Sequence, residues 1–188
     1  MSGTRILGVL LGILLLLGLF AVFQYNGLVS AREAVTTREA NISTQLQRRM
    51  DLIPNLVKSV KRFTEHENEV IAKVTEARAQ LAGAKTMTER AQGDAALSSA
   101  LKGLMVVVEN YPQLKSDTVY VGLMDELSGT ENRIAVSRTA YNEAVQTYNT
   151  QIITFPSNLF AGMFGFVKAD YFRADPAASQ VPDVGSML

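Results

Sequence analysis

The sequence predicts an all-α protein, in which one N-terminal transmembrane helix is followed by an antiparallel, up-and-down four-helix bundle with long helices. Three observations support this fold class. Residues 6–23 form an uninterrupted apolar run. Between residues 24 and 154, apolar side chains recur at every third or fourth position, which is the spacing of one face of an α-helix. No stretch of this region shows the sustained alternation of period two that would indicate strands.

The first element is the run Ile6–Phe23, whose 18 residues include no charged or hydrogen-bonding side chain. As a helix it would extend about 27 Å, just enough to cross the hydrocarbon core of a bilayer. The run ends without the small-x-small pattern of a cleavage site, so we expect residues 1–24 to be an uncleaved anchor rather than a signal peptide. Gly8 and Gly12 form a GxxxG pattern, which either packs membrane helices together or only reflects how common glycine is in them. The residues assigned to the anchor are Ile6, Gly8, Gly12, Phe23 and the interfacial Tyr25.

Residues 25–154 make up the predicted bundle, and helix-breaking residues divide it into segments. Asp51 followed by Pro54 has two interpretations. Either Asp51 caps a second helix with proline in its first turn, or Pro54 kinks one helix that runs from the membrane to about Leu81. The other boundaries follow from local signals. These are Gly83 and Thr86-x-Thr88-Glu89 before the third helix, Asn110-Tyr111-Pro112 after it, Ser116-Asp117 before the fourth helix and Phe155-Pro156-Ser157 after it.

The composition excludes several classes of function. The 18 Lys and Arg residues balance 18 Asp and Glu residues, so no excess positive charge favours nucleic acid. The chain has no Cys, which excludes disulfides, thiolate nucleophiles and Cys-based metal sites. The single histidine, His66, precedes Glu67 as in a zinc-protease motif, but Val70 stands where the second histidine would be. We therefore expect no enzyme activity, no cofactor, no metal and no nucleic-acid partner.

A set of short motifs runs through residues 25–172. The most specific is Arg48-Arg-x-Asp51-Leu-Ile-Pro54-Asn-Leu-Val57. The others are Tyr25-Asn-x-Leu-Val29-x-x-Arg32-x-x-Val35, His66-Glu67, Tyr111-Pro-x-Leu-Lys115, Leu127-Ser-x-x-Glu131-x-x-Ile134, Tyr141-Asn-x-x-Val145-x-x-Tyr148-Asn149, Phe155-Pro156, Phe164-Gly-Phe166 and Tyr171-Phe172. Together they resemble the LemA family of bacterial membrane proteins over nearly the whole soluble part.

The resemblance implies an anchor in the bacterial cell (inner) membrane and an antiparallel helical bundle, and it implies no enzyme activity. Many relatives carry a tryptophan where this chain has Glu39, so the packing of the first helix is expected to differ. Some relatives carry a lipoprotein cysteine just before the pair Tyr25-Asn26, and this chain has none. The basic residues that flank the span are nearly balanced. Because a lipid-anchored relative implies an exported domain, we place the soluble domain on the periplasmic side.

Seven charged residues fall on the apolar stripes of the predicted helices, where an unpaired charge would be costly. Four are arginines and three are glutamates, which suggests mutual pairing. We interpret them as interhelical ion pairs that fix the register of the bundle. The alternative is a polar site inside the bundle. The seven are Arg32, Glu39, Arg49, Glu67, Arg78, Glu131 and Arg138.

Aromatic residues near the C-terminus are the candidates for an interface. Two Tyr-Asn pairs lie one heptad apart, either as core tyrosines or as a seam between subunits. Residues 155–173 contain five of the eight Phe, and they would cover the bundle, lie at the membrane interface or contact a neighbouring subunit. If Pro54 reverses the chain this segment returns to the membrane, and if Pro54 only kinks a helix it lies at the distal end. The candidate interface residues are Tyr141, Tyr148, Phe160, Phe164, Phe166 and Phe172; we expect residues 174–188 to be a disordered tail.

These features are compatible with two functions. We favour a membrane-anchored, non-enzymatic helical scaffold that self-associates into a homo-oligomer and organises or shapes the membrane, with membrane lipid as its other partner. The alternative is an accessory or binding module for another membrane protein, such as a protease or a signalling system. An enzyme would need a pocket built from Arg, Glu and Tyr, and it has the least support.

Overall fold

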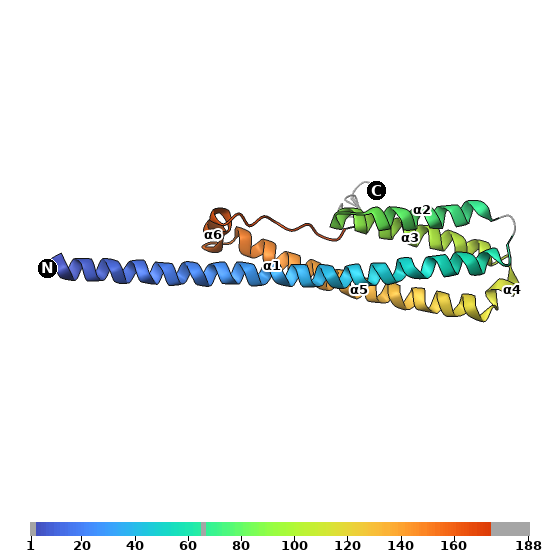
Figure 1. Ribbon diagram of the computed structural model, residues 1–188, viewed down its shortest axis with the longest axis horizontal. Helices are drawn as coiled ribbons and strands as arrows, with labels where there is room; N and C mark the ends of the chain where they lie inside the picture. The colour runs from blue at the N-terminus through green and yellow to red at the C-terminus, as the bar shows by residue number, and fades with distance from the viewer. Residues whose placement is uncertain (1–2, 65–66, 174–188) are drawn as a thin grey trace, which may run out of the picture. The chain divides into compact units, whose positions relative to one another are not determined.

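The protein is described by a computed structural model that covers residues 3–64 and 67–173 (Figure 1). Within these residues all regular structure is helical, and strands are absent. The predicted fold class, a long apolar N-terminal helix followed by several long packed helices, is confirmed. His66 and the expected disordered tail lie outside the described residues. The helices are α1 (Gly3–Lys61), α2 (Asn68–Gly83), α3 (Met87–Val108), α4 (Pro112–Lys115), α5 (Thr118–Ile153) and α6 (Ser157–Met163).

Contacts divide the chain into two compact units, and the two longest helices contribute to both. The anchor unit consists of the described part of Met1–Glu39 together with Tyr141–Ala169. The bundle unit consists of Ala40–Ala140 together with the residues that follow from Asp170. Both boundaries therefore fall inside α1 and α5, whereas the sequence-based boundaries after residues 24 and 154 follow changes in composition.

The bundle unit is built from four helical segments joined by short connections. They are the part of α1 after Glu39, α2, α3 and the part of α5 before Tyr141. Side chains link α1 to its neighbours, as when Arg90 of α3 donates to the Ser43 hydroxyl at 2.7 Å. The apolar stripes of the sequence form the core of this unit. Its most deeply buried side chains, each at most 1% exposed, include Ile42, Ile53, Leu56, Val60, Val74, Leu97, Leu104, Leu114 and Ile134.

Pro54 lies inside α1, which continues to Lys61 as one helix of 59 residues. Of the two predictions for this proline, the one that places Pro54 inside a single helix continuing from the apolar run is confirmed, and the one that starts a second helix there is wrong. The expected end of the first helix near Leu81 is also wrong, because α1 ends at Lys61. Proline has no N–H, so the carbonyl oxygen of Met50, four residues earlier, loses its helical donor. The Nε of Arg78 in α2 donates to that oxygen at 2.9 Å. A side chain from the neighbouring helix thus replaces the missing hydrogen bond.

Two helices begin where the local signals predict, at Thr86 and at Asp117. At the start of α3, the N–H of Glu89 donates to Thr86 Oγ1 at 3.1 Å, and the N–H of Thr86 donates to Glu89 Oε2 at 3.0 Å. At the start of α5, the N–H of Tyr120 donates to Asp117 Oδ1 at 2.9 Å. These bonds satisfy amides that the first turn of a helix leaves without partners. Both predicted starts are confirmed.

The hairpin of α2 and α3 has one very close approach, between Gly93 and Leu81. A Cβ atom added to Gly93 would lie 2.8 Å from the Cα of Leu81 and 3.1 Å from its Cβ. Real Cβ atoms do not approach a backbone atom this closely, so only glycine fits without a shift of the helices.

The anchor unit contains the first part of α1, the end of α5 and α6. From Leu7 to Phe23 the side chains of α1 are almost all exposed, and an 18-residue window has a mean hydropathy of 2.6. Among the described residues, α1 is the one helix that is long and apolar enough to cross a membrane. Ile6 belongs to this helix, but its side chain lies outside the described part. The core of the unit is formed by Leu28, Val35, Tyr141, Val145, Tyr148, Ala161 and Phe166.

Candidate functional site

Arg49 of α1 is the centre of a buried charged cluster in the bundle unit. Its side chain is 4% exposed. Nη1 forms an ion pair with Asp94 of α3, and Nη2 lies 2.6 Å from the carboxylate of Glu131 in α5. Nη2 also donates to the hydroxyl of Ser98 at 2.9 Å. One guanidinium therefore connects three helices, which is the arrangement that the register interpretation requires.

Asp94 is the partner that sequence reasoning missed. It is 3% exposed, and burial raises the pKa of its carboxyl group above the ordinary value for aspartate. The charge of Arg49 opposes this rise, and the charge of Glu131 adds to it. A signal was available, because Asp94 lies midway between Ala91 and Leu97 on the apolar stripe of α3. Its pairing with Arg49 could not be predicted, since the two residues are 45 positions apart.

The other charged residues of the predicted set make different contacts. Arg78 donates to the Met50 carbonyl, as described above. Glu67 accepts a hydrogen bond at 2.9 Å from the hydroxyl of Tyr111, whose pKa this bond raises. Of the predicted mutual pairs, Arg49 with Glu131 is brought together. Glu39 is half-buried on α1.

The remaining two arginines of the set lie over phenylalanine rings. In the anchor unit, the guanidinium of Arg32 lies 5.2 Å from the centre of the Phe166 ring. In the bundle unit, Arg138 lies 5.1 Å from the centre of the Phe172 ring. Both distances are in the range of cation–π attraction, which stabilises a positive charge over the face of a ring. Both rings are buried, so the two phenylalanines have structural roles within the chain.

The aromatic segment packs against α1 at the end of the apolar run. The ring of Phe160 in α6 contacts Phe20 edge-on, with the ring centres 6.0 Å apart. Tyr25 contacts Phe164 and Phe166 in the same manner, at 4.9 and 5.9 Å. Figure 1 shows α6 beside α1 in this region. Three of the six predicted interface residues, Phe160, Phe164 and Phe166, therefore lie against α1 close to the predicted interfacial Tyr25.

The chain after α6 is held by side chains of α5. The hydroxyl of Tyr148 donates to the carbonyl of Val167 at 2.9 Å. The side-chain amide of Asn149 donates to the carbonyl of Ala169 and accepts from its N–H, both at 2.9 Å. Burial raises the pKa of Tyr148, which keeps its hydroxyl protonated and able to donate. Within the chain, Tyr148 thus takes the structure of a core tyrosine with a bonded hydroxyl, and Tyr141 is also buried.

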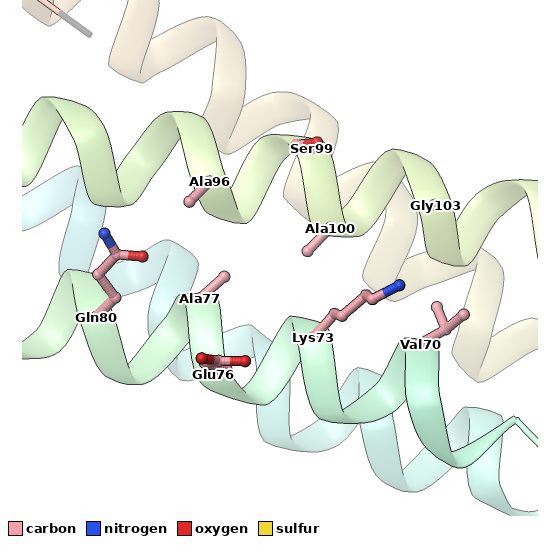
Figure 2. Close-up of a pocket in the computed structure, with 9 residues that line it drawn as sticks. All are labelled: Val70, Lys73, Glu76, Ala77, Gln80, Ala96, Ser99, Ala100 and Gly103. Carbon is pink, nitrogen blue, oxygen red and sulfur yellow. The ribbon is translucent and has the colours of Figure 1, made fainter.

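A shallow groove runs along the outside of α2 and α3, and small side chains make up about half of its lining (Figure 2). Ala77 of α2 and Ala96 and Ala100 of α3 point into it. Lys73 and Glu76 stand at its edge. Such a surface lets another helix approach closely, because alanine and glycine do not hold backbones apart.

No group of three or more metal-ligating side chains lies together within residues 3–64 and 67–173. The half-motif at His66 cannot be examined, because that residue lies outside the described part. The charged residues around Arg49 form one cluster that joins α1, α3 and α5. The surface features are the aromatic segment and the α2–α3 groove.

Comparison with known proteins places the chain in a family. The model of the LemA family matches residues 38–185. The chain is similar to Magnetosome protein MamQ 2 of Paramagnetospirillum magneticum, with 29% identity over 185 residues, covering 83% of this chain and 67% of that protein. It is 28% identical to Magnetosome protein MamQ of Magnetospirillum gryphiswaldense, with the same shares covered. Protein LemA of Metamycoplasma hominis is 24% identical over 154 residues, covering 81% of this chain and 70% of that protein. This chain belongs to the LemA family.

Proposed function

We propose that this protein is a membrane-anchored, non-enzymatic scaffold that self-associates and thereby organises the membrane around it. The observation that carries the proposal is the apolar surface that the anchor unit leaves uncovered. It includes most of the span from Leu7 to Phe23 and five further large apolar side chains between Phe155 and Val167. A surface of this size is typical of contact with lipid or with other subunits. Confinement to a membrane also raises the effective concentration of one copy near another.

The span itself offers a face for self-association. Gly8 and Gly12 lie on one side of α1, and a Cβ atom added to either would meet nothing within 4 Å. A second helix can approach such a face closely. Gly18 is equally open but points to another side of the helix, because it is six residues beyond Gly12. These glycines give a matched set of variants.

The test is the size distribution of full-length protein in native lipid, measured by mass photometry of lipid particles extracted without detergent. We expect oligomers for the natural sequence and smaller species for Gly8→Leu with Gly12→Leu. Gly18→Leu is the control and should leave the distribution unchanged. A strict monomer of the natural sequence at every concentration would overturn the proposal.

The non-enzymatic part of the proposal is supported by how the charged residues are used. An enzyme would have to employ Arg49, Asp94 and Glu131, because a buried carboxyl group with a raised pKa is a common mark of an active site. These groups bind one another and Ser98, so they act as a link between helices. We expect Asp94→Asn to alter stability and to leave membrane attachment and oligomer size intact.

For localisation, we propose that the protein lies in the bacterial inner membrane with its bundle on the periplasmic side. The chain has no cysteine, so a single introduced cysteine reports on sidedness without background. Val136 is 71% exposed and is suited to this substitution. With Val136→Cys, we expect labelling by a membrane-impermeant maleimide in cells with a permeabilised outer membrane. Labelling only after lysis would place the bundle in the cytoplasm.

A second candidate is an accessory module for another membrane protein, and the α2–α3 groove favours it. The groove lies on the outside of the bundle unit, and five of the nine residues that line it are small (Figure 2). Crosslinking in native membranes would then capture a stoichiometric heterocomplex with little homo-oligomer. Filling the groove with Ala96→Leu should abolish that complex, whereas the scaffold proposal expects the homo-oligomer to dominate the crosslinked products.

A further inference from the structure

The segment that includes α6 exposes an unusual number of large apolar side chains. Exposure is 75% for Phe155, 60% for Leu159, 73% for Met163, 48% for Phe164 and 76% for Val167. Leu159 and Met163 are four residues apart and share one face of α6. Phe160, on another side of the helix, packs onto Phe20. Transfer of such side chains out of water is favourable, so this face favours an apolar environment.

Contacts within the anchor unit fix the level of α6 along α1. Phe160 lies against Phe20, the hydroxyl of Ser157 donates to the Gln24 side chain at 3.3 Å, and Phe164 lies against Tyr25. The residues of α1 that α6 and Phe164 contact thus run from Phe20 to Tyr25, five steps or about 7.5 Å of helix rise. The apolar run ends at Phe23, in the middle of this interval. If α1 crosses the membrane, α6 lies where the acyl chains meet the headgroups.

The composition of the segment fits this position. Between Phe155 and Ala169 there is no acidic residue, and the one charged side chain is the exposed Lys168. A lysine at this place can reach the lipid phosphates while its neighbours contact acyl chains. The segment itself therefore carries no carboxylate that would have to be desolvated or would be repelled by anionic lipid.

The backbone of the segment is also prepared for an apolar environment. After α6, the N–H of Phe166 donates to the Ala161 carbonyl at 2.9 Å, and the N–H of Phe164 donates to the Phe160 carbonyl at 2.9 Å. Gly165, with φ of 70°, makes the left-handed turn that this helix end requires. Because these amides are satisfied inside the segment, contact with lipid does not strand them.

We propose that Phe155–Val167 is a second membrane-binding element, inserted into the leaflet at the C-terminal end of the span. This element contacts the boundary between the acyl chains and the headgroups of the bilayer. We identify the bilayer as its partner because the element is continuous with the apolar span. The inference rests on the membrane attachment in the proposed function and is independent of self-association. An element inserted in one leaflet adds area to that leaflet alone, which would give the scaffold a means of bending the membrane.

The experiment uses full-length protein in vesicles of phosphatidylcholine and phosphatidylglycerol, some with brominated acyl chains. The chain has no tryptophan, so Met163→Trp and Leu159→Trp each introduce a single reporter on the exposed face of α6. Both positions are exposed, so the substitutions do not disturb the core. The control is Thr37→Trp, at an exposed position of α1 that lies about 21 Å of helix rise beyond Phe23.

We expect blue-shifted emission at positions 163 and 159, with loss of most of the fluorescence when the bromine atoms are near the headgroups and a smaller loss when they are deep. Emission at position 37 should be unshifted and unquenched. Blue-shifted but unquenched emission at position 163 would mean that protein, such as a second copy, covers α6, and it would overturn the proposal. Unshifted, unquenched emission would overturn it as well.

The size of the particles in the same samples separates this inference from the proposed function. A monomer whose reporter is quenched by lipid would refute self-association and support membrane insertion of α6. An oligomer whose reporter is unquenched would support self-association and refute membrane insertion of α6.

Discussion

Arg49 and Asp94 show how a buried charge specifies the packing of a bundle. Each side chain is 4% exposed, so neither charge retains much contact with water. Removing two charges from water is expensive, and their attraction compensates for it only when the geometry is good. Arg49 binds Asp94, Ser98 and Glu131 together, but within the described residues its buried Nε has no hydrogen-bond partner, and burial still raises the pKa of Asp94. A shift of α3 along α1 would separate these groups, which makes the cluster a determinant of register.

Loss of Arg49 should therefore be costly. In Arg49→Met, the carboxylate of Asp94 keeps its burial and loses its cation, so we expect destabilisation of about 3–5 kcal/mol. Urea unfolding followed by circular dichroism measures this change. Arg48→Ala is the control, because Arg48 pairs with Glu126 at the exposed surface and should cost no more than about 1 kcal/mol. A stabilised and still assembled Arg49→Met protein would refute the register role.

The raised pKa of Asp94 predicts a pH dependence with a definite sign. The folded chain holds the Asp94 proton more tightly than the unfolded chain, in which the pKa is about 3.9. The stability that Asp94 contributes is thus fully present below about pH 4 and is lost as pH rises through the higher pKa of the folded state. We expect the unfolding free energy of the natural protein, minus that of Asp94→Asn, to decrease over this interval. The subtraction removes the contribution of the carboxyl groups that both proteins share. An increase of this difference with rising pH would contradict a raised pKa for Asp94.

At the scale of elements, α1 shows how a helix continues past a proline. A proline in a helix interior removes one hydrogen bond and costs about 3 kcal/mol. Arg78 recovers part of this loss by donating to the carbonyl of Met50. Because the donor comes from α2, the continuity of α1 depends on its packing in the bundle. An isolated peptide with the sequence around Pro54 would lack this bond.

A double-mutant cycle measures the relation between Pro54 and Arg78. In the natural background, Arg78→Met leaves the Met50 carbonyl without a donor and should cost about 1–3 kcal/mol. In a Pro54→Ala background the N–H of residue 54 can donate to the Met50 carbonyl. Arg78→Met should therefore cost clearly less stability in that background. Thermal unfolding of the four proteins gives the coupling. Equal costs in the two backgrounds would show that Arg78 does not substitute for the proline.

The α2–α3 hairpin makes a prediction about two glycines of one helix. Gly93→Ala should destabilise the protein by about 1–3 kcal/mol, because the new methyl group would collide with the backbone of Leu81. Gly103→Ala adds a methyl group where nothing lies within 4 Å, so it should stabilise α3 by about 0.5–1 kcal/mol. Melting temperatures of the two variants test the contrast. Similar shifts for both would argue against the close approach at Gly93.

The elements that sequence analysis predicts correctly are those specified by local patterns. Apolar periodicity gives the helices, and Thr86 and Asp117 mark two helix starts because a capping side chain acts within three residues. The sequence leaves the role of Pro54 open, because the donor that replaces its hydrogen bond is Arg78, 24 residues away in sequence and on another helix. Arg49 was identified as a buried charge, but its partner Asp94 was not, since only the fold brings the two together. The placement of α6 beside Phe20 was likewise beyond any local signal.

At the scale of the whole molecule, the balance of charge bears on assembly. The formal net charge is zero, with 18 residues of each sign. Copies of the chain therefore have no net repulsion to overcome when they meet. Salt weakens association between surfaces of opposite charge because it screens their attraction, whereas association through apolar contacts depends little on such screening.

This balance predicts that self-association depends little on ionic strength. Fluorescence energy transfer between donor- and acceptor-labelled copies in the same vesicles should change little when sodium chloride is raised from low to high concentration. The double variant Gly8→Leu/Gly12→Leu changes only the transmembrane span. It should show less energy transfer than the natural sequence at every salt concentration. A steep fall in transfer with salt for the natural sequence would indicate that ion pairs hold the copies together.

The side chain of Asn149 has one more consequence, which concerns the kinetics of local opening. Its amide binds both the carbonyl and the N–H of Ala169, as a neighbouring strand would, although Ala169 belongs to neither helix nor sheet. The amide proton of Ala169 should therefore exchange with solvent slowly, at a rate set by the opening of the whole anchor unit. In Asn149→Ala that proton should exchange as fast as in an unstructured peptide. One side chain thus makes a backbone amide outside regular structure a reporter of the stability of this unit.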